Sequence, residues 1–263
     1  MHGDGKQKIQ KDIKVENNNP SKVYEECFKV HTYEVDIHNR LTIQSLAQFL
    51  QESASNHAAL LGCDVEYLLG NSRTWVLSRM AIEIEEFIPL GETITIKTWP
   101  ADTEKLFFIR DFEITNSKGS IIGSGTSYWI FINTENGRPV HPSKKEIVFD
   151  YENIERGFNR SLSKLPSQDN TEPSRSFHVR YSDLDLNNHV NNIKYIEWGM
   201  EGIDPEYKRA HMPYTLEINF LAEAKYSDLV DLSMEERLSE NFLHSLYIAN
   251  KEICRIKSVW KSI

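Results

Sequence analysis

An internal repeat constrains the fold of this chain more than any other feature of its sequence. In each half, an extended segment is followed by one amphipathic helix and then by several strand-like runs. A constant shift of 149 residues (185 − 36) pairs Asp36 with Asp185 and Phe49 with Trp198. Such a repeat predicts two structural units of the same type that pack side by side.

Each half carries one helical pattern. In the first half, apolar residues recur at intervals of three and four from Leu46 to Leu61, and Gly62 is a suitable stop. In the second half, the same spacing runs from Ile193 to Ile203. We therefore expect one long helix in each unit.

The remaining patterns predict strands. Residues 28–36 are predicted to be extended, and apolar residues alternate with polar ones within 80–84, 93–97, 108–114 and 126–132. Similar runs lie at 177–181, 216–220, 229–232, 246–248 and 253–256. Period-two alternation over consecutive runs predicts antiparallel sheets with one buried face. The fold class is therefore α+β, with each helix against the concave face of a sheet.

Polarity divides the chain into segments. Residues 1–24 are predicted to form a solvated tail, 25–135 the first unit and 174–263 the second. Residues 136–173 are polar and interrupted by Pro and Gly, which is typical of a linker.

Composition excludes several classes of protein. The net charge of −9 argues against general nucleic-acid binding, and no apolar run is long enough to cross a membrane. The N-terminus lacks the features of a signal or transit peptide. Cys27, Cys63 and Cys254 have neither disulfide nor zinc spacing, so we expect free thiols in a reducing cytoplasm, with no metal and no cofactor.

The two copies differ where their helices begin. The second copy has Asn187 and His189 where the first has His38 and Arg40. This asymmetry predicts a single active site in a pseudo-dimer, although helix capping by Asx residues is an alternative explanation. A helix N-terminus offers N–H groups and positive dipole charge to an oxyanion, and His can transfer a proton near neutral pH. A carboxylate that activates water would complete the site.

Residues 180–202, RYSDLDLNNHVNNIKYIEWGMEG, resemble the signature D-x-N-x-H-V-N-N-x-x-Y of the acyl–acyl-carrier-protein thioesterases. Residues 74–84 and the dipeptide Trp99-Pro100 are also similar to that family, so the likeness spans most of 28–263. The resemblance implies a tandem double hotdog fold. It also implies hydrolysis of fatty acyl thioesters on acyl carrier protein, which ends fatty acid synthesis. The lack of a transit peptide favours a bacterial, cytoplasmic form.

The family places a Glu-Cys pair on a strand after the second helix. Here Glu223 matches the glutamate, whereas Ala224 stands where plant members have cysteine. The resemblance therefore implies a water-based mechanism with four catalytic residues, namely Asp185, Asn187, His189 and Glu223. Asn187 and backbone N–H groups would bind the oxyanion, Glu223 and His189 would activate water, and Asp185 would orient His189 or Asn187. A solvated strand position is the alternative for Glu223.

The acyl chain is expected between the helix and the sheet of the first unit. The candidate lining residues, each of which could instead be ordinary core, are Leu46, Phe49, Leu50, Trp75, Leu77 and Met80. Acyl carrier proteins are acidic, so docking on this acidic chain requires a local basic patch. The linker offers Lys144, Lys145, Arg156, Arg160 and Lys164, which could equally be a solvated face. A homodimer is possible.

Other functions fit the sequence less well or stay open. An acyl-coenzyme A thioesterase, a hydratase or a non-catalytic acyl-binding protein could share the fold. A calcium loop starting at Asp183 is rejected, because Asn188 and Lys194 replace its required Gly and Glu. Gly123-Ser-Gly125 does not form a serine-hydrolase elbow. The preferred acyl chain length is not predicted.

Overall fold

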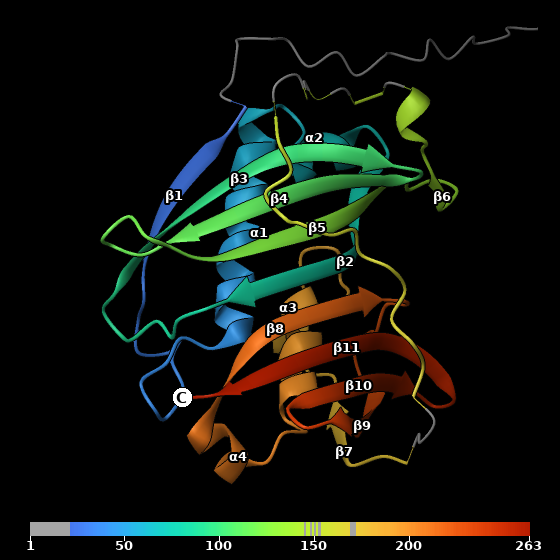
Figure 1. Ribbon diagram of the computed structural model, residues 1–263. Helices are drawn as coiled ribbons and strands as arrows, with labels where there is room; N and C mark the ends of the chain where they lie inside the picture. The colour runs from blue at the N-terminus through green and yellow to red at the C-terminus, as the bar shows by residue number, and fades with distance from the viewer. Residues whose placement is uncertain (1–21, 145, 148, 150, 152–153, 169–171) are drawn as a thin grey trace, which may run out of the picture.

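The computed structural model of the chain describes residues 22–144, 146–147, 149, 151, 154–168 and 172–263. Nearly all of the expected tail, 1–24, and Lys145 lie outside these residues. One antiparallel sheet runs through the molecule in the order β1-β3-β4-β5-β2-β8-β11-β10-β9-β7, with β6 beside β5 (Figure 1). The strands of its first half are β1 (Tyr24–Lys29), β2 (Arg73–Ile84), β3 (Thr93–Glu104), β4 (Phe107–Thr115), β5 (Ile121–Asn133) and β6 (Arg138–Pro139). Those of its second half are β7 (Arg175–His178), β8 (His211–Phe220), β9 (Leu229–Leu238), β10 (Asn241–Ile248) and β11 (Lys251–Ser262).

The two halves of the sheet join at one seam. Strand β2 pairs with β8 in antiparallel register, from Arg79 opposite Asn219 to Glu83 opposite Thr215. The two expected units therefore share a continuous sheet, and the α+β class is confirmed. The prediction of an extended segment over 28–36 was mostly wrong, because β1 covers Tyr24–Lys29 and the chain then enters a turn.

Both main helices lie on the same side of this sheet (Figure 1). Helix α1 (Ile43–Leu60) buries Leu46 and Leu50, and the turn that follows it contains Gly62, whose positive φ of 70° favours glycine. Helix α3 (Asn192–Met200) is half as long. A Cβ on its Gly199 would lie 2.4 Å from Ile256 Cδ1, so the glycine permits close packing on β11. Two short helices, α2 (Val65–Gly70) and α4 (Pro205–Ala210), follow the main ones.

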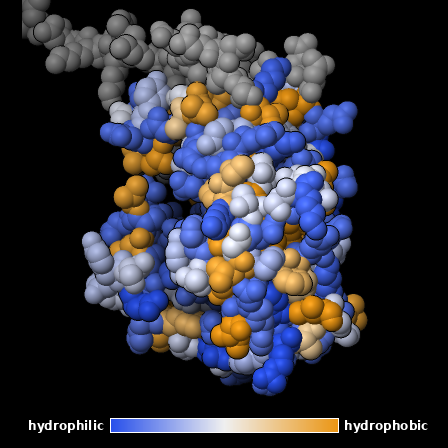
Figure 2. Space-filling view, turned by 90° about the vertical axis from the view of Figure 1, so that its left-hand side faces the viewer, coloured by the Kyte–Doolittle hydropathy of each residue, from blue (hydrophilic) through white to orange (hydrophobic). Residues whose placement is uncertain are grey.

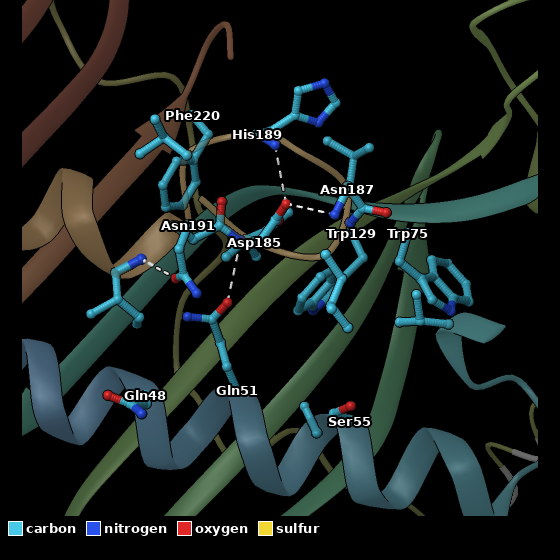
Figure 3. A pocket seen from close by; sticks show the side chains of 18 of the residues that line it. Gln48, Gln51, Ser55, Trp75, Trp129, Asp185, Asn187, His189, Asn191 and Phe220 are labelled. Carbon is cyan, nitrogen blue, oxygen red and sulfur yellow. Dashed lines mark hydrogen bonds between the residues drawn. The ribbon is translucent and has the colours of Figure 1, made fainter. Parts of the chain in front are cut away.

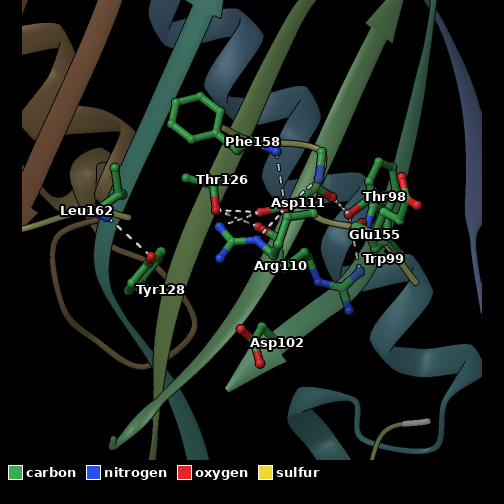
Figure 4. Close-up of polar contacts among 12 residues, drawn as sticks. Thr98, Trp99, Asp102, Arg110, Asp111, Thr126, Tyr128, Glu155, Phe158 and Leu162 are labelled. Atoms are coloured by element: carbon green, nitrogen blue, oxygen red, sulfur yellow. Dashed lines mark hydrogen bonds and ion pairs between the residues drawn. The ribbon is translucent and has the colours of Figure 1, made fainter. Parts of the chain in front are cut away.

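The segment 154–168 of the linker crosses the opposite face of the sheet, in front of the strands in Figure 1. A buried carboxylate anchors it (Figure 4). Asp111 on β4 accepts hydrogen bonds from Nε of Arg156 (2.7 Å), from the N–H groups of Gly157 (2.9 Å) and Phe158 (3.3 Å), and from the hydroxyl of Thr126 (2.6 Å). These donors satisfy the hydrogen-bonding capacity of a carboxylate that is fully buried.

Farther along, the same segment bridges the seam. Arg160 pairs with Glu217 of β8 (2.7 Å) and with Glu83 of β2 (3.5 Å). The N–H of Leu165 donates to Asn219 Oδ1 (2.7 Å). The linker therefore ties the two halves together over their shared strands.

These contacts correct part of the expected basic docking patch. Arg156 and Arg160 are bound to carboxylates on the outer face of the sheet, so their charges are largely neutralised there. Lys144 and Lys164 are exposed. Lys145 is outside the described residues.

Hydrophilic side chains predominate on the face shown in Figure 2, with apolar ones in small separate groups between them. Among the described residues, no helix combines the length and apolar character needed to cross a bilayer.

Candidate active site

The sequence repeat forms two copies of one turn, each of which leads into a main helix. The backbone N–H of Asp36 donates to Arg40 O, and that of Asp185 donates to His189 O, both at 2.8 Å. Left-handed residues complete the two turns, Asn39 with φ 65° in the first and Asn188 with φ 61° in the second. The repeat is therefore a repeat of backbone conformation, and it ends at equivalent N-caps, Thr42 and Asn191.

The side chain at the fourth position after the aspartate differs between the copies. In the first copy, Arg40 is buried, binds Asp36 (2.7 Å), and donates to Lys208 O (2.6 Å) and His211 O (3.0 Å) at the end of α4. In the second copy, His189 is partly exposed, and its Nε2 lies 3.1 Å from Glu223 Oε2. Of the two equivalent side chains, Arg40 and His189, only His189 borders open space.

Glu223 is held in place by its neighbour in the chain. Ala224 is buried, its N–H donates to the hydroxyl of Tyr195 on α3 (2.8 Å), and its carbonyl accepts from Val190 N–H (3.1 Å). Burial raises the pKa of Tyr195, which keeps the hydroxyl protonated. The segment after β8 is therefore fastened to the turn and to α3, which brings Glu223 to His189.

Asp185 acts on the backbone of the turn. Its Oδ1 accepts hydrogen bonds from the N–H groups of Asn187 (2.8 Å) and His189 (3.2 Å), as Figure 3 shows. The observed contacts of this carboxylate are therefore with the main chain rather than with the His189 imidazole or the Asn187 amide. The Asn187 side chain is exposed, and Asn191 caps α3 by accepting from Ile193 N–H (2.9 Å).

A second carboxylate stabilises the start of the turn. Asp183 is buried and accepts from the backbone and guanidinium of Arg180, and Lys194 Nζ lies 3.7 Å from it. Burial works against ionisation of Asp183, but the hydrogen bonds from Arg180 and the charges of Arg180 and Lys194 outweigh it and lower the pKa. The turn thus rests on an ionised, hydrogen-bonded acid at neutral pH.

A cavity of about 1640 Å³ opens at this turn. The four predicted catalytic residues, Asp185, Asn187, His189 and Glu223, all line it. Its wall continues along α1, the first residues of β2, and the ends of β4 and β5. The volume exceeds that of a typical small-ligand pocket and is large enough for a long flexible chain.

The predicted lining residues divide into two groups. Trp75 and Leu77 of β2 line the cavity. The other four are buried in the hydrophobic core and are absent from the cavity wall, namely Leu46, Phe49, Leu50 and Met80. The apolar stripe of α1 faces the hydrophobic core between the helix and the sheet, so these side chains pack there and do not border the cavity.

A polar stripe of α1 that the sequence did not predict as part of the site also lines the cavity. Gln48, Gln51 and Ser55 line the cavity and project from the helix toward the turn (Figure 3). Gln51 accepts a hydrogen bond from Asn192 at the start of α3 (3.2 Å), so the site lies between the two units. The spacing of these residues on one helix face was the available signal.

The fold and the site define a class: a double hotdog protein whose single open turn carries a His–Glu pair beside a large cavity. Residues 21–151 match the family model described as the acyl-ACP thioesterase N-terminal domain, and residues 167–262 match the corresponding C-terminal domain. The chain belongs to the acyl-ACP thioesterase family.

Individual relatives agree with this assignment. The chain is 30% identical over 232 residues to oleoyl-acyl carrier protein thioesterase 1 of Arabidopsis thaliana chloroplasts, an alignment that covers 79% of this chain and 62% of that protein. The chain thus spans about three fifths of the length of the plant relatives it matches.

Solved structures are also similar. An acyl-ACP thioesterase from Bacteroides thetaiotaomicron matches with a TM-score of 0.80 and 27% identity, covering 91% of this chain and 98% of that one. A putative oleoyl thioesterase from Lactobacillus plantarum matches with a TM-score of 0.81 and 22% identity, covering 92% and 96%. At that identity, the second match supports the fold alone.

Proposed function

We propose that the protein hydrolyses fatty acyl thioesters of acyl carrier protein to free fatty acid and the carrier thiol. One observation carries this proposal: the His189–Glu223 pair, at 3.1 Å, lies on the wall of a cavity of about 1640 Å³. A His–carboxylate pair can accept a proton from water, and the cavity can hold the chain whose carbonyl is attacked. Family membership supports the same reaction class.

The proposed reaction begins with the thioester carbonyl at the turn. Water loses a proton to the His189–Glu223 pair, and the resulting hydroxide attacks the carbonyl carbon. The Asn187 amide and main-chain N–H groups of the turn stabilise the oxyanion. The carbon–sulfur bond then breaks, and the proton held by the pair passes to the departing thiolate. Asp185 positions these groups through the two backbone N–H groups that it binds.

The absence of a nucleophilic cysteine beside Glu223 favours direct attack by water. Ala224 occupies the next position, and its side chain is buried. Cys63 lines the cavity, but burial raises the pKa of its thiol to about 12, so it is not a thiolate at neutral pH. The two other thiols, Cys27 and Cys254, do not line the cavity.

Acyl carrier protein is the proposed partner, and a homodimer and a cytoplasmic location stay predictions. If docking depends on charge, the rate on carrier-bound substrate falls as ionic strength rises. Exposed Lys144 and Lys164 are the linker candidates that the ion pairs of the outer face leave available. A rate that is independent of salt would contradict electrostatic docking.

The direct test compares matched acyl-carrier and acyl-coenzyme A thioesters in steady state. The wild-type protein is expected to release free acid from the carrier substrate with the higher kcat/KM. The folded variant Glu223→Gln is expected to lose about a hundredfold or more of this rate. A higher kcat/KM on coenzyme A would indicate the rival thioesterase, and acyl binding without product release would indicate a carrier of fatty chains.

A further inference from the structure

A buried arginine lies in the acyl cavity, away from the catalytic turn. Neighbouring residues of β4 face opposite sides of the sheet, so Asp111 binds the linker on the outer face while Arg110 points toward α1 (Figure 4). Arg110 is 8% exposed and lines the cavity. The proposed reaction gives this cation no role.

The observed partners of Arg110 are neutral acceptors. Its Nη1 lies 3.0 Å from His57 Nδ1 on α1 and 3.2 Å from Thr98 Oγ1 on β3. Within the described part of the chain, no carboxylate forms an ion pair with this guanidinium. A buried charge without a counterion is rare in proteins, because desolvation is compensated only by pairing or by hydrogen bonds.

Two other described groups close to Arg110 are also uncharged. Cys63 and Tyr151 are near enough to influence its pKa, which burial lowers to about 10. Burial raises the pKa of the Cys63 thiol to about 12, and burial also raises the pKa of the Tyr151 hydroxyl. At neutral pH, these two described neighbours of Arg110 are therefore uncharged.

A guanidinium has five N–H donors, and both observed contacts use Nη1. Among the residues that the structure describes, Nε and Nη2 have no protein acceptor, so the contents of the cavity must supply one. Water can do so in the empty site. A plain alkyl chain that displaces this water offers no acceptor and leaves charged donors unpaired, which is unfavourable.

We propose that the cavity selects acyl chains that carry an oxygen function, a hydroxyl, a keto group or a carboxylate, where the chain meets Arg110. This inference rests on the proposed thioesterase function and specifies its substrate class. The oxygen accepts hydrogen bonds from Nε or Nη2 and replaces the displaced water. Chains without oxygen are expected to bind best when they are short enough to leave that water in place.

The test uses carrier-bound acyl thioesters from octanoyl to stearoyl, each in an unsubstituted, an ω-hydroxy, an (ω−1)-oxo and an ω-carboxy form. At the chain length that reaches Arg110, an oxygenated form is expected to have a kcat/KM at least about tenfold above the plain chain, because hydrogen bonds to charged groups are worth that factor or more. The hydroxy, oxo and carboxy arms identify which oxygen is preferred.

The variant Arg110→Met is expected to reverse this preference at the same chain length. Lys97→Met is the matched control, because Lys97 lies on neighbouring β3 and contacts Glu25 and Glu113 outside the cavity. It should retain the wild-type preference. If Arg110→Met does not fold, binding of the free ω-hydroxy acid and the plain acid to the wild-type protein replaces it, with at least about a tenfold difference expected.

Equal rates for plain and oxygenated chains at every length, or a preference that survives Arg110→Met, would overturn the inference. These outcomes differ from failure of the proposed function, in which no carrier thioester of any kind is hydrolysed.

Discussion

Arg40 and His189 occupy equivalent positions in two copies of one turn, but only His189 lines the cavity, where it contacts a carboxylate that also lines it. Arg40 is buried against the end of α4, where it donates to the carbonyls of Lys208 and His211. His189 lies 3.1 Å from Glu223. In the duplicated fold, one turn thus joins the two halves, and the other lies on the cavity wall.

The variant Arg40→Ala is expected to lower the free energy of unfolding by about 2 kcal/mol, because two carbonyls and Asp36 lose a charged donor. The loss of stability is limited because Asp36 is 31% exposed, so water can solvate its carboxylate in the variant. Urea unfolding measures the loss. The folded variant should hydrolyse substrate at the wild-type kcat, and a tenfold slower reaction would show that the first turn contributes to catalysis.

The two turn aspartates provide a matched pair of variants. Asp185 and Asp36 each accept two backbone N–H bonds within their turn. Asp185→Ala is expected to lower both kcat and stability, because the turn that carries Asn187 and His189 loses its support. Asp36→Ala should lower stability and leave kcat near wild type. Equal losses of kcat in both variants would contradict a single working site.

The attachment of the linker segment 154–168 to the sheet is expected to depend on Asp111. Asp111→Ala removes a buried acceptor and leaves Arg156 and two linker N–H groups unpaired, so the free energy of unfolding should fall by about 3 kcal/mol or more. Limited proteolysis should then cut within 154–168 faster than in the wild-type protein. Unchanged cleavage in that segment would show that Asp111 does not anchor it.

Acid is expected to destabilise the protein through His244. This imidazole is buried, its Nε2 lies 2.9 Å from Ser258 Oγ, and burial lowers its pKa from 6.5 to about 3. Above pH 6.5 neither state binds a proton here, whereas between pH 6.5 and 3 only the unfolded state does. Stability therefore falls as pH falls through this window, by up to about 1.4 kcal/mol per pH unit.

The variant His244→Gln should flatten this dependence. The measurement is the free energy of unfolding against pH, in urea, for both proteins. Parallel curves for the wild-type and variant proteins between pH 6.5 and 3 would show that His244 does not cause the loss.

Much of the fold was predictable because each copy of the repeat shows its turn, helix and strands in short-range sequence patterns. The shift that aligns Asp36 with Asp185 also aligns the observed turns and the N-caps Thr42 and Asn191. The pairing of β2 with β8 was not predictable, because the register between two sheet edges depends on contacts distant in sequence. The linker contacts of Asp111 depend on the same kind of long-range packing.

The site was predictable in part. The motif predicted Asp185, Asn187 and His189 as site residues, and all three line one cavity with Glu223, which contacts His189. The apolar stripe of α1 suggested lining residues such as Leu46, but burial in the core is the usual fate of such a stripe. The neighbouring unit decides which face of α1 borders the cavity, through contacts such as that of Gln51 with Asn192. Such contacts between distant residues cannot be inferred from the pattern of the helix alone.

The central claim, that His189 and Glu223 act as one unit, is tested most directly by a double-mutant cycle on kcat/KM for a carrier-bound thioester. His189→Ala and Glu223→Ala are each expected to reduce kcat/KM by about a hundredfold to ten-thousandfold, and the double variant should be about as slow as the slower single one. The claim would be contradicted if the fold-loss of kcat/KM in the double variant equalled the product of the two single losses. A folded single variant with a near wild-type rate would also contradict it.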